Sequence, residues 1–438
     1  MISAAENGAA LHGDAPGRVC GFDPRMNRYA RYCYKRIVLF ASLQPNAGCR
    51  CEGGNGEFCL HPGQQHLKSD IMERYEDRRI AEKLQEVEDP RRTSKGNIRH
   101  KLEDIIIIGL CSLICNGNDV SDMEDFGEAR QAWLQQFLEL PQGIPDSDTF
   151  RRVFERQNPS ALAECLYDWL GQHRPEGSVI AVDGKTICGS KSENHKAYHV
   201  VSAFVAENQL TLGEVAADEK SNEITAVPEL LDLIDIKGSI ITADAMSCQK
   251  EIVRKIRDKK AEYVIALKQN QPALRSDADL YFQTSTVKLP SVSTTEKAHG
   301  RIESRTYQLL TDVTWLSDKG QWTDLKAIGM VKSKRIIQGE ESYECRYYIT
   351  SLTAVEQFAY AVRKHWSIEN QLHWRLDVIF REDAARARKN LSPLNLNILR
   401  KVALALCRNA EFDKRVSLQK RRYWACLDPV AFLRILFG

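Results

Sequence analysis

Between residues 70 and 172, apolar residues recur at the spacing of helices that bury one face. Met72–Val87 is charged and amphipathic, and Asp89-Pro90 interrupts it because proline cannot continue a helix. Lys101–Cys115 follows as an apolar helix. The pattern predicts an all-helical N-terminal domain over residues 69–172, with further helices at Val120–Phe126, Ala129–Leu138 and Ser147–Gly171.

From residue 177 the pattern changes to short apolar runs rich in β-branched residues. Three runs follow one another with short links, and two more alternate with helical segments. This order predicts an α/β architecture with a mixed sheet, and it is the order of the ribonuclease-H-like fold. The strands are expected at Ser178–Ile187, His199–Ala206, Gln209–Ala216, Ser239–Ala243 and Glu262–Lys268, and the helices at Asn222–Leu233 and Ser247–Lys260.

Residues 285–350 interrupt the α/β pattern, because short β-like runs alternate there with polar turns. Helical character returns from Ala354 to about Arg408. We therefore expect an α/β core formed by residues 177–284 and 351–410, a β-rich insertion at 285–350 and a basic C-terminal tail at 411–438. The expected strands of the insertion are Thr306–Leu310, Lys326–Val331 and Tyr343–Ile349.

Residues 1–68 differ from the rest of the chain, because Gly, Pro, Asn and Cys occur there without a clear period. Cys49, Cys51, Cys59 and His61 lie close together, but they lack the paired C-x2-C spacing of common zinc fingers. We interpret this stretch as a poorly ordered N-terminal extension, with Met72 as an alternative start of translation.

The length of 438 residues predicts two or three domains, and the 43% hydrophobic and 27% charged residues fit folded domains. The net charge is only +2, but Arg381–Gly438 holds thirteen Lys and Arg against five Asp and Glu, a local balance of 13 − 5 = +8. That segment is a candidate surface for a phosphate backbone, with a solvated helix surface as the alternative. Scattered cysteines in apolar runs, and apolar runs too short to cross a bilayer, predict a cytoplasmic protein.

Two aspartates occupy positions where apolar strands turn polar. Asp183 follows Val179–Val182, and Asp244 follows Ile240–Ala243. A buried carboxylate is costly unless it is paired or binds a cation, although Gly184 gives a turn role some weight. Because a sheet can set both strands side by side, the two aspartates point to one shared site. Divalent cations relieve the repulsion between such carboxylates, and an oxygen ligand set favours Mg²⁺ or Mn²⁺ over zinc.

A two-cation site of this kind needs a third carboxylate, and Glu369 is the candidate. On a regular helix His365, Glu369 and His373 share one face, at steps of four residues. The two histidines would stand about 12 Å apart along the axis, too far to bind one ion, so we reject a His-Glu-His metal site. A solvated helix edge is the other interpretation of this face. The alternatives for the third acid are Asp377, Glu382 and Asp383.

Several further residues fit a nucleic-acid substrate. They are Lys185 after the first aspartate, Lys268 and Asn270 after the fifth strand, and His299, Arg301 and Arg305 in a basic turn of the insertion. Trp315 and Trp322 could stack on an unpaired base, although tryptophan more often belongs to a core.

From about residue 80 to about residue 410, the chain resembles the H-repeat-associated transposases of bacterial insertion sequences. The likeness is specific because several separate blocks carry it. The blocks are DPRR at Asp89, IAVDGKT at Ile180, DEKSNEI at Asp218, IITADAM at Ile240, ALKQNQ at Ala266, HGRIESR at His299 and HWSIENQLHWRLDVIFREDAARARKN at His365.

The resemblance implies a ribonuclease-H-like catalytic domain whose D-D-E triad falls on Asp183, Asp244 and Glu369. It further implies two Mg²⁺ ions, for which Mn²⁺ can substitute, and a DNA-associated enzyme. The enzyme would cut double-stranded DNA at the terminal inverted repeats of a mobile element and join the ends to target DNA. Binding two ends implies at least a homodimer. A cutting-only endonuclease and a transposon-derived DNA-binding protein without catalysis are the alternatives.

Related transposase families place Tyr, Arg and Lys around the glutamate, where this chain has Val362, His365 and Leu376. The phosphate-contacting roles of those three residues therefore do not carry over. On this helix, the candidates for DNA contact are His365 and Arg375.

Overall fold

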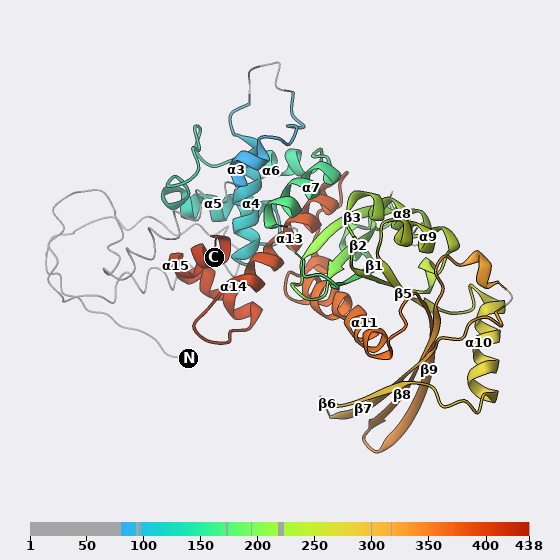
Figure 1. The fold of residues 1–438 in the computed structure, drawn as a ribbon. Helices are drawn as coiled ribbons and strands as arrows, with labels where there is room; N and C mark the ends of the chain where they lie inside the picture. Colours follow the sequence, from blue (N-terminus) through green and yellow to red (C-terminus); the bar gives the residue numbers. More distant parts are fainter. Residues whose placement is uncertain are drawn as a thin grey trace, which may run out of the picture. The chain divides into compact units, whose positions relative to one another are not determined.

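A computed structural model describes residues 80–437, except 93–95, 97, 172–173, 194, 218–222, 299 and 317. The predicted N-terminal extension, Met72 and His299 lie outside the described residues. Helices and strands carry the labels of Figure 1. Among the helices described, none combines the length and the apolar character that crossing a membrane requires.

The expected helical domain is present and is built around α4, which is buried on nearly all sides because its sequence is apolar all round. The two expected helices after it form one helix, α5, whose backbone departs from helical geometry at Arg130. The last expected helix is divided in two, because the Asn158 side chain caps a new helix that begins at Pro159. The helices are α3 (Ile80–Leu84), α4 (Leu102–Ile114), α5 (Val120–Leu134), α6 (Ser147–Phe154) and α7 (Pro159–Leu170).

The predicted α/β segment folds as a mixed sheet, and each expected strand and helix is found with small changes at its ends. Strands β1 and β4 are parallel, as are β4 and β5, whereas β1–β2 and β2–β3 are antiparallel. The elements are β1 (Val179–Thr186), β2 (His199–Val205), β3 (Thr211–Ala217), α8 (Glu223–Leu233), β4 (Ile240–Ala243), α9 (Lys250–Asp258) and β5 (Glu262–Leu267).

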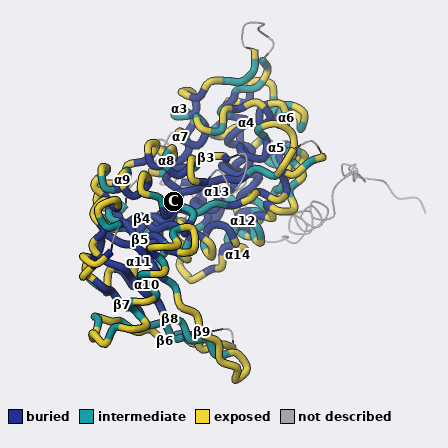
Figure 2. Tube along the Cα trace, turned by 90° about the vertical axis from the view of Figure 1, so that its right-hand side faces the viewer, coloured by how far each residue is buried: buried dark blue, intermediate teal, exposed yellow. Residues whose placement is uncertain are grey.

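The β-rich segment continues the same sheet, because its last strand pairs antiparallel with β5. The complete strand order is β3-β2-β1-β4-β5-β9-β8-β7-β6. In Figure 2 the outer ends of β8 and β9 are exposed, whereas the ends next to β5 are buried. Helix α10 (Pro272–Thr284) precedes this segment, which comprises β6 (Ser291–Ala298), β7 (Arg301–Leu310), β8 (Ala327–Ile337) and β9 (Glu340–Thr350).

Helices cover both faces of the sheet. One face of β1, with Ile180 and Val182, packs in a core with α8 and α9. The other face packs against α11 (Val355–Ser367), which contacts β1, β4 and β5 and is seen beside the sheet in Figure 1. Helix α11 continues as a π-helix, Ile368–His373, and then as α12 (Trp374–Val378).

The C-terminal part of the chain returns to the helical domain. Helix α13 (Ser392–Asn409) is almost wholly buried and packs against α4 and α7. The predicted basic tail contains two further helices, α14 (Leu418–Leu427) and α15 (Pro429–Phe437). Phe432 of α15 meets Trp133 of α5 with ring centroids 4.9 Å apart, so this segment contributes to the core of the helical domain.

Candidate active site

The side of the sheet that Asp183 faces follows from the alternation of β1. Ile180 and Val182 point to the core under α8 and α9, so the odd-numbered positions point to the opposite face. Asp183 therefore lies on the α11 side, beyond the buried Ala181. Gly184 is needed beside it, because a Cβ there would lie 2.3 Å from Nε2 of the buried His199.

Asp244 stands next to Asp183 across the β1–β4 pair. The parallel register matches Val182 with Ala243, so the following residues of both strands are the two aspartates. The Asp244 Oδ1 accepts a hydrogen bond of 2.8 Å from the Met246 amide, which makes it the cap of a short 3₁₀ turn. The exposed Asn270 donates its side-chain amide to the Ala245 carbonyl, so the segment after β5 helps to hold this turn.

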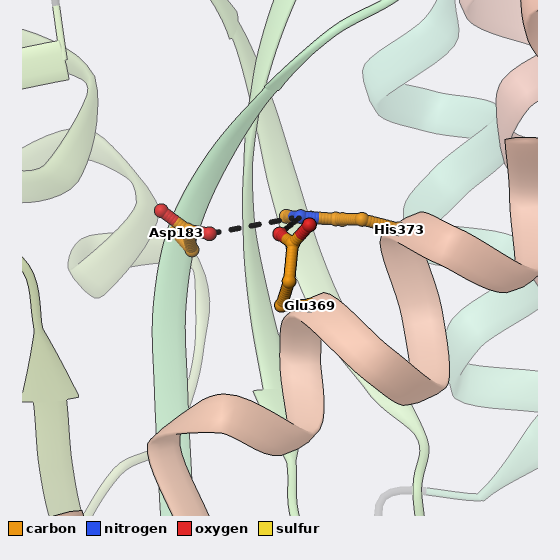
Figure 3. A group of neighbouring side chains, drawn as sticks. All are labelled: Asp183, Glu369 and His373. Atoms are coloured by element: carbon orange, nitrogen blue, oxygen red, sulfur yellow. Dashed lines mark hydrogen bonds and ion pairs between the residues drawn. The ribbon is translucent and has the colours of Figure 1, made fainter. Parts of the chain in front are cut away.

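Glu369 approaches from the other side, on the π-helix. The Trp374 amide bonds to the Glu369 carbonyl five residues earlier, which is the π-helical pattern. Such segments are rare and are found frequently at functional sites. In Figure 3 the Glu369 and His373 side chains point together toward Asp183 on β1. One ligand atom from each of these three residues lies within 4.8 Å of the other two, as expected for groups that can share a metal ion.

The charges at this position fit a cation. Burial raises the pKa of Asp183 to about 6, and the negative charges of Asp244 and Glu223 add to this effect, against the opposing influence of His373. The hydrogen bond with His373 lowers the pKa of Glu369. A partly buried carboxylate that is costly to ionise, next to two further ligand groups, matches the donor set of a divalent ion.

The two histidines of the helix have different positions. The His365 Nδ1 lies 3.0 Å from the Thr242 hydroxyl on β4, and burial lowers the pKa of His365 to about 4. Its ring is therefore neutral at pH 7 and points to the sheet, which opposes the predicted DNA contact. His373 instead joins Asp183 and Glu369. The sequence places His373 one helical turn after Glu369, on the same face, but the predicted ligand set contained carboxylates alone.

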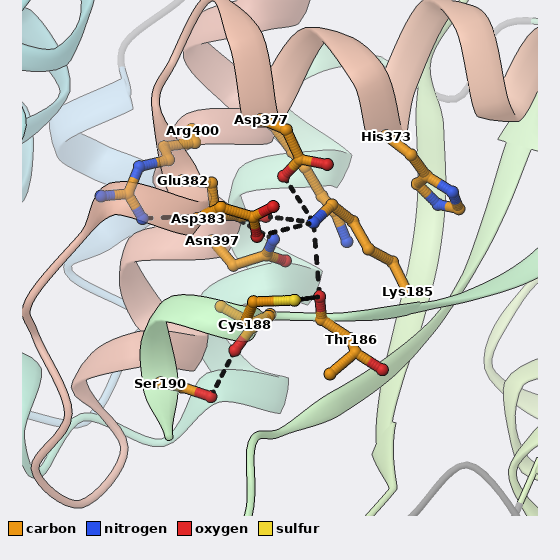
Figure 4. Close-up of polar contacts among 12 residues, drawn as sticks. Lys185, Thr186, Cys188, Ser190, His373, Asp377, Glu382, Asp383, Asn397 and Arg400 are labelled. Carbon is orange, nitrogen blue, oxygen red and sulfur yellow. Dashed lines mark hydrogen bonds and ion pairs between the residues drawn. The ribbon is translucent and has the colours of Figure 1, made fainter. Parts of the chain in front are cut away.

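Lys185 lies in a second charged cluster, shown in Figure 4, that lines the same end of β1. Its ammonium is 2.7 Å from Asp377 Oδ1, 3.3 Å from Glu382 Oε2 and 3.8 Å from Asp383 Oδ1. Burial lowers the pKa of Lys185, but these carboxylates outweigh that effect and raise it. The ammonium of Lys185 is thus paired with carboxylates of the protein. This pairing argues against the predicted contact of Lys185 with a phosphate.

The same cluster bears on the identity of the third acid. The three alternatives to Glu369 surround Lys185, and in the described residues none of them belongs to the metal-ligating group with Asp183. Glu382 is also 2.8 Å from the Asn397 side chain and 3.8 Å from Arg400, so its charge is balanced within the protein. The geometry therefore favours Glu369 over Asp377, Glu382 and Asp383.

The remaining candidates for DNA contact lie at different depths. Lys268 and Arg301 are exposed, and Glu303 lies 3.9 Å from Arg301 and 2.7 Å from Arg305. Arg375 lies over the Trp374 ring, with 5.6 Å between the guanidinium carbon and the ring centroid. The tryptophans of the insertion differ too: Trp322 is buried in the core and Trp315 stacks on Tyr281 at 5.1 Å.

Known proteins match the chain over both parts of the fold. A family model described as "Transposase DDE domain" matches residues 174–406, and one described as "DDE_Tnp_1-associated" matches residues 81–170. "Putative transposase YncI" of Escherichia coli O157:H7 is 39% identical over 341 residues, which are 75% of this chain and 87% of that protein. "H repeat-associated putative transposase YhhI" of Escherichia coli K12 is 37% identical over 380 residues, which are 82% and 98%.

Among solved structures, a piggyBac transposase synaptic complex with hairpin DNA aligns with a TM-score of 0.37 and 10% identity. The alignment covers 84% of this chain and 79% of the other.

Proposed function

The chain belongs to the DDE transposase family, with transposase-named relatives at 37% and 39% identity, and on this basis we propose that it cuts and joins DNA at the ends of an insertion sequence. The observation that carries the proposal is the meeting of Asp183 and Glu369 from separate parts of the sequence, with Asp244 beside them on the neighbouring strand. Members of this family are enzymes of the polynucleotidyl-transferase type and use divalent metal ions.

We assign Asp183, Asp244 and Glu369 as the catalytic triad that holds two Mg²⁺ ions, with Mn²⁺ as a substitute. The ions, when bound, activate the attacking oxygen and stabilise the leaving oxygen of an in-line displacement. The chain itself supplies the geometry. The β1–β4 register sets the two aspartates side by side, and the packing of α11 on β1 and β4 brings Glu369 to Asp183.

The reaction has two parts. Water attacks the phosphodiester at the element end and releases a 3′-hydroxyl. That hydroxyl then attacks target DNA in line and joins the strands without a covalent enzyme intermediate. The substrate is double-stranded DNA, at terminal inverted repeats and at a target site, and holding two ends together calls for at least a homodimer. Lys268 and Arg301 are exposed residues suited to phosphate contact.

The test is cleavage of a labelled DNA that carries the element end, with Mg²⁺, by the full chain and by Asp183→Asn, Asp244→Asn and Glu369→Gln. Each substitution keeps the size of the side chain and removes its charge. We expect each variant to bind the DNA and to lose cleavage by 10³-fold or more, on the order of the loss when one catalytic group is removed. Glu356→Gln, an exposed position at the start of α11, is the matched control.

The other outcomes identify the alternatives. Retained cleavage by Glu369→Gln would place the third acid elsewhere. Cleavage without joining of pre-cut ends would indicate an endonuclease. Binding without any cleavage by the unmodified chain would indicate a DNA-binding protein that has lost catalysis.

A further inference from the structure

The His373 ring has an unusual environment for a buried histidine. It is 4% exposed, and its Nδ1 lies 3.3 Å from Glu369 Oε2 and 3.6 Å from Asp183 Oδ2. Good N–H···O hydrogen bonds are about 2.7–3.2 Å long, so both contacts are longer than usual. The other ring nitrogen, Nε2, is buried and has no hydrogen-bond partner in the described part of the chain. Buried ring nitrogens are normally paired more closely, and the two long contacts of Nδ1 call for an explanation.

The distances match those between ligands of one metal ion. Ligand atoms about 2.1 Å from a common ion are about 3.0 Å apart at octahedral angles and about 3.4 Å apart at tetrahedral angles. The separations of 3.3 and 3.6 Å lie close to that range. The Nδ1 thus lies close to both carboxylates, at separations compatible with a shared ion.

We propose that His373 binds a catalytic divalent cation directly through Nδ1, together with Asp183 and Glu369. This inference rests on the proposed function, and it adds a nitrogen ligand to the carboxylate triad. Imidazole suits first-row transition metals, whereas Mg²⁺ strongly prefers oxygen. One cation position is therefore a mixed nitrogen and oxygen site, and it selects Mn²⁺ over Mg²⁺.

The ring is held for this role by its place in the chain. Ile368 and Leu372, on the same π-helix, are buried in the core that also contains Ala181 of β1. Their packing fixes the π-helix against β1, so that Glu369 and His373 face Asp183 together (Figure 3). A ligand held by packing in this way loses little side-chain entropy when the ion binds.

Mn²⁺ binding to the full chain without DNA provides the test, because it does not depend on activity. Pulsed electron paramagnetic resonance of bound Mn²⁺ detects a directly coordinated ¹⁴N nucleus, and calorimetric titration gives the affinities for Mn²⁺ and Mg²⁺. We expect a ¹⁴N coupling in the unmodified protein and a preference for Mn²⁺ of tenfold or more. His373→Gln should abolish the coupling and lower the Mn²⁺ affinity about 10–100-fold, with a much smaller change for Mg²⁺.

Two further variants make the outcome decisive. Asn370→Ala, exposed and next to Glu369, should keep both the coupling and the affinity. Asp183→Asn should weaken Mn²⁺ binding, and if it does not, the proposed catalytic site itself is in the wrong place. Mn²⁺ binding that depends on Asp183 but shows no ¹⁴N coupling would overturn the role of His373 and leave the triad intact.

Discussion

At the scale of single residues, Gly184 shows how closely the site is packed. A Cβ at this position would lie 2.3 Å from His199 Nε2 and 2.5 Å from Glu223 Oε1. These two atoms are themselves 2.6 Å apart in a buried pair. No side chain can enter without separating that pair, and Asp183 is the preceding residue. The glycine is therefore a packing requirement at the back of the active site.

We predict that Gly184→Ala lowers the free energy of unfolding by about 1–3 kcal/mol, the usual cost of overpacking a buried position. Denaturant unfolding of both proteins measures the change. Gly320→Ala is the matched control, because nothing lies within 4 Å of a Cβ there and its φ is not in the left-handed region. Equal stability of the two variants would mean that the His199–Glu223 pair moves aside without cost.

Candidate site residues can be selected from the sequence where a local pattern marks them, but not where their position depends on contacts between distant segments. Asp183 and Asp244 could be selected as candidates because each follows an apolar run, and a local pattern of this kind needs no knowledge of distant contacts. The position of His373 on the same helix face as Glu369 could be predicted too, but its approach to Asp183 could not, because that depends on which strand the helix meets. The expectation of a regular helix also gave no hint of the π-helix that carries Glu369 and His373.

At the scale of elements, Lys185 joins β1 to the segment that follows the π-helix of the candidate site. It pairs with Asp377 at the end of α12 and with Glu382, which is 0% exposed. Asp183, two residues earlier on β1, contacts the π-helix directly, so β1 is held to this helical segment at both positions. The cluster therefore fixes the spacing between β1 and α12, and with it the geometry of the proposed triad.

We predict that Lys185→Met lowers the free energy of unfolding by about 3–5 kcal/mol, because it leaves buried carboxylates without their cation. Adding Glu382→Gln to this variant should recover part of the loss, and denaturant unfolding of the single and double variants measures the coupling. Lys191→Met, at an exposed position nearby in the sequence, is the control. A loss below 1 kcal/mol for Lys185→Met would show that the cluster does not fix β1 to α12.

The elements themselves were largely predictable where one face of a strand or helix is buried. The strands from β1 to β5 were expected within a few residues of their observed bounds. Strand β6 was not, because this edge strand is mostly exposed and its sequence SVSTTEKA shows no apolar alternation. Helix α10 was also missed, since Leu274 and Ala278 are its only fully buried residues in the described structure.

At the scale of the whole molecule, the sheet shows what a local pattern cannot predict. The sequence indicated a β-rich insertion, but not that β9 pairs with β5 at positions such as Leu267 and Tyr347, 80 residues apart. Such pairing depends on contacts between distant segments. The same limit applies to the C-terminal helices, because the apolar run PVAFLRILF of α15 does not show that Phe432 packs on Trp133 of α5.

The positive charge of the C-terminal segment is not distributed as the sequence suggested. The basic excess after Arg381 suggested a phosphate surface, but Arg422 is buried and bonds to the Leu113 carbonyl. Arg421 donates to the carbonyls of Cys407, Arg408 and Ala410 at the end of α13. Arginines in such places stabilise the carboxyl ends of helices. The guanidinium groups of Arg421 and Arg422 therefore bind protein carbonyls, whereas Arg301 on β7 is exposed and forms an ion pair with Glu303 at 3.9 Å.

The salt dependence of DNA binding can separate these two uses of charge. Each phosphate contact adds about one to the slope of log affinity against log salt concentration, because it releases about one counterion. We predict that Arg301→Met lowers the magnitude of this slope by about one. Arg421→Met should leave the slope unchanged and lower the free energy of unfolding. Binding titrations over a range of salt, at a temperature where circular dichroism shows both variants folded, measure the slopes. An equal reduction in both variants would mean that the C-terminal helices contact DNA as well, and an unchanged slope in Arg301→Met would place the DNA surface away from β7.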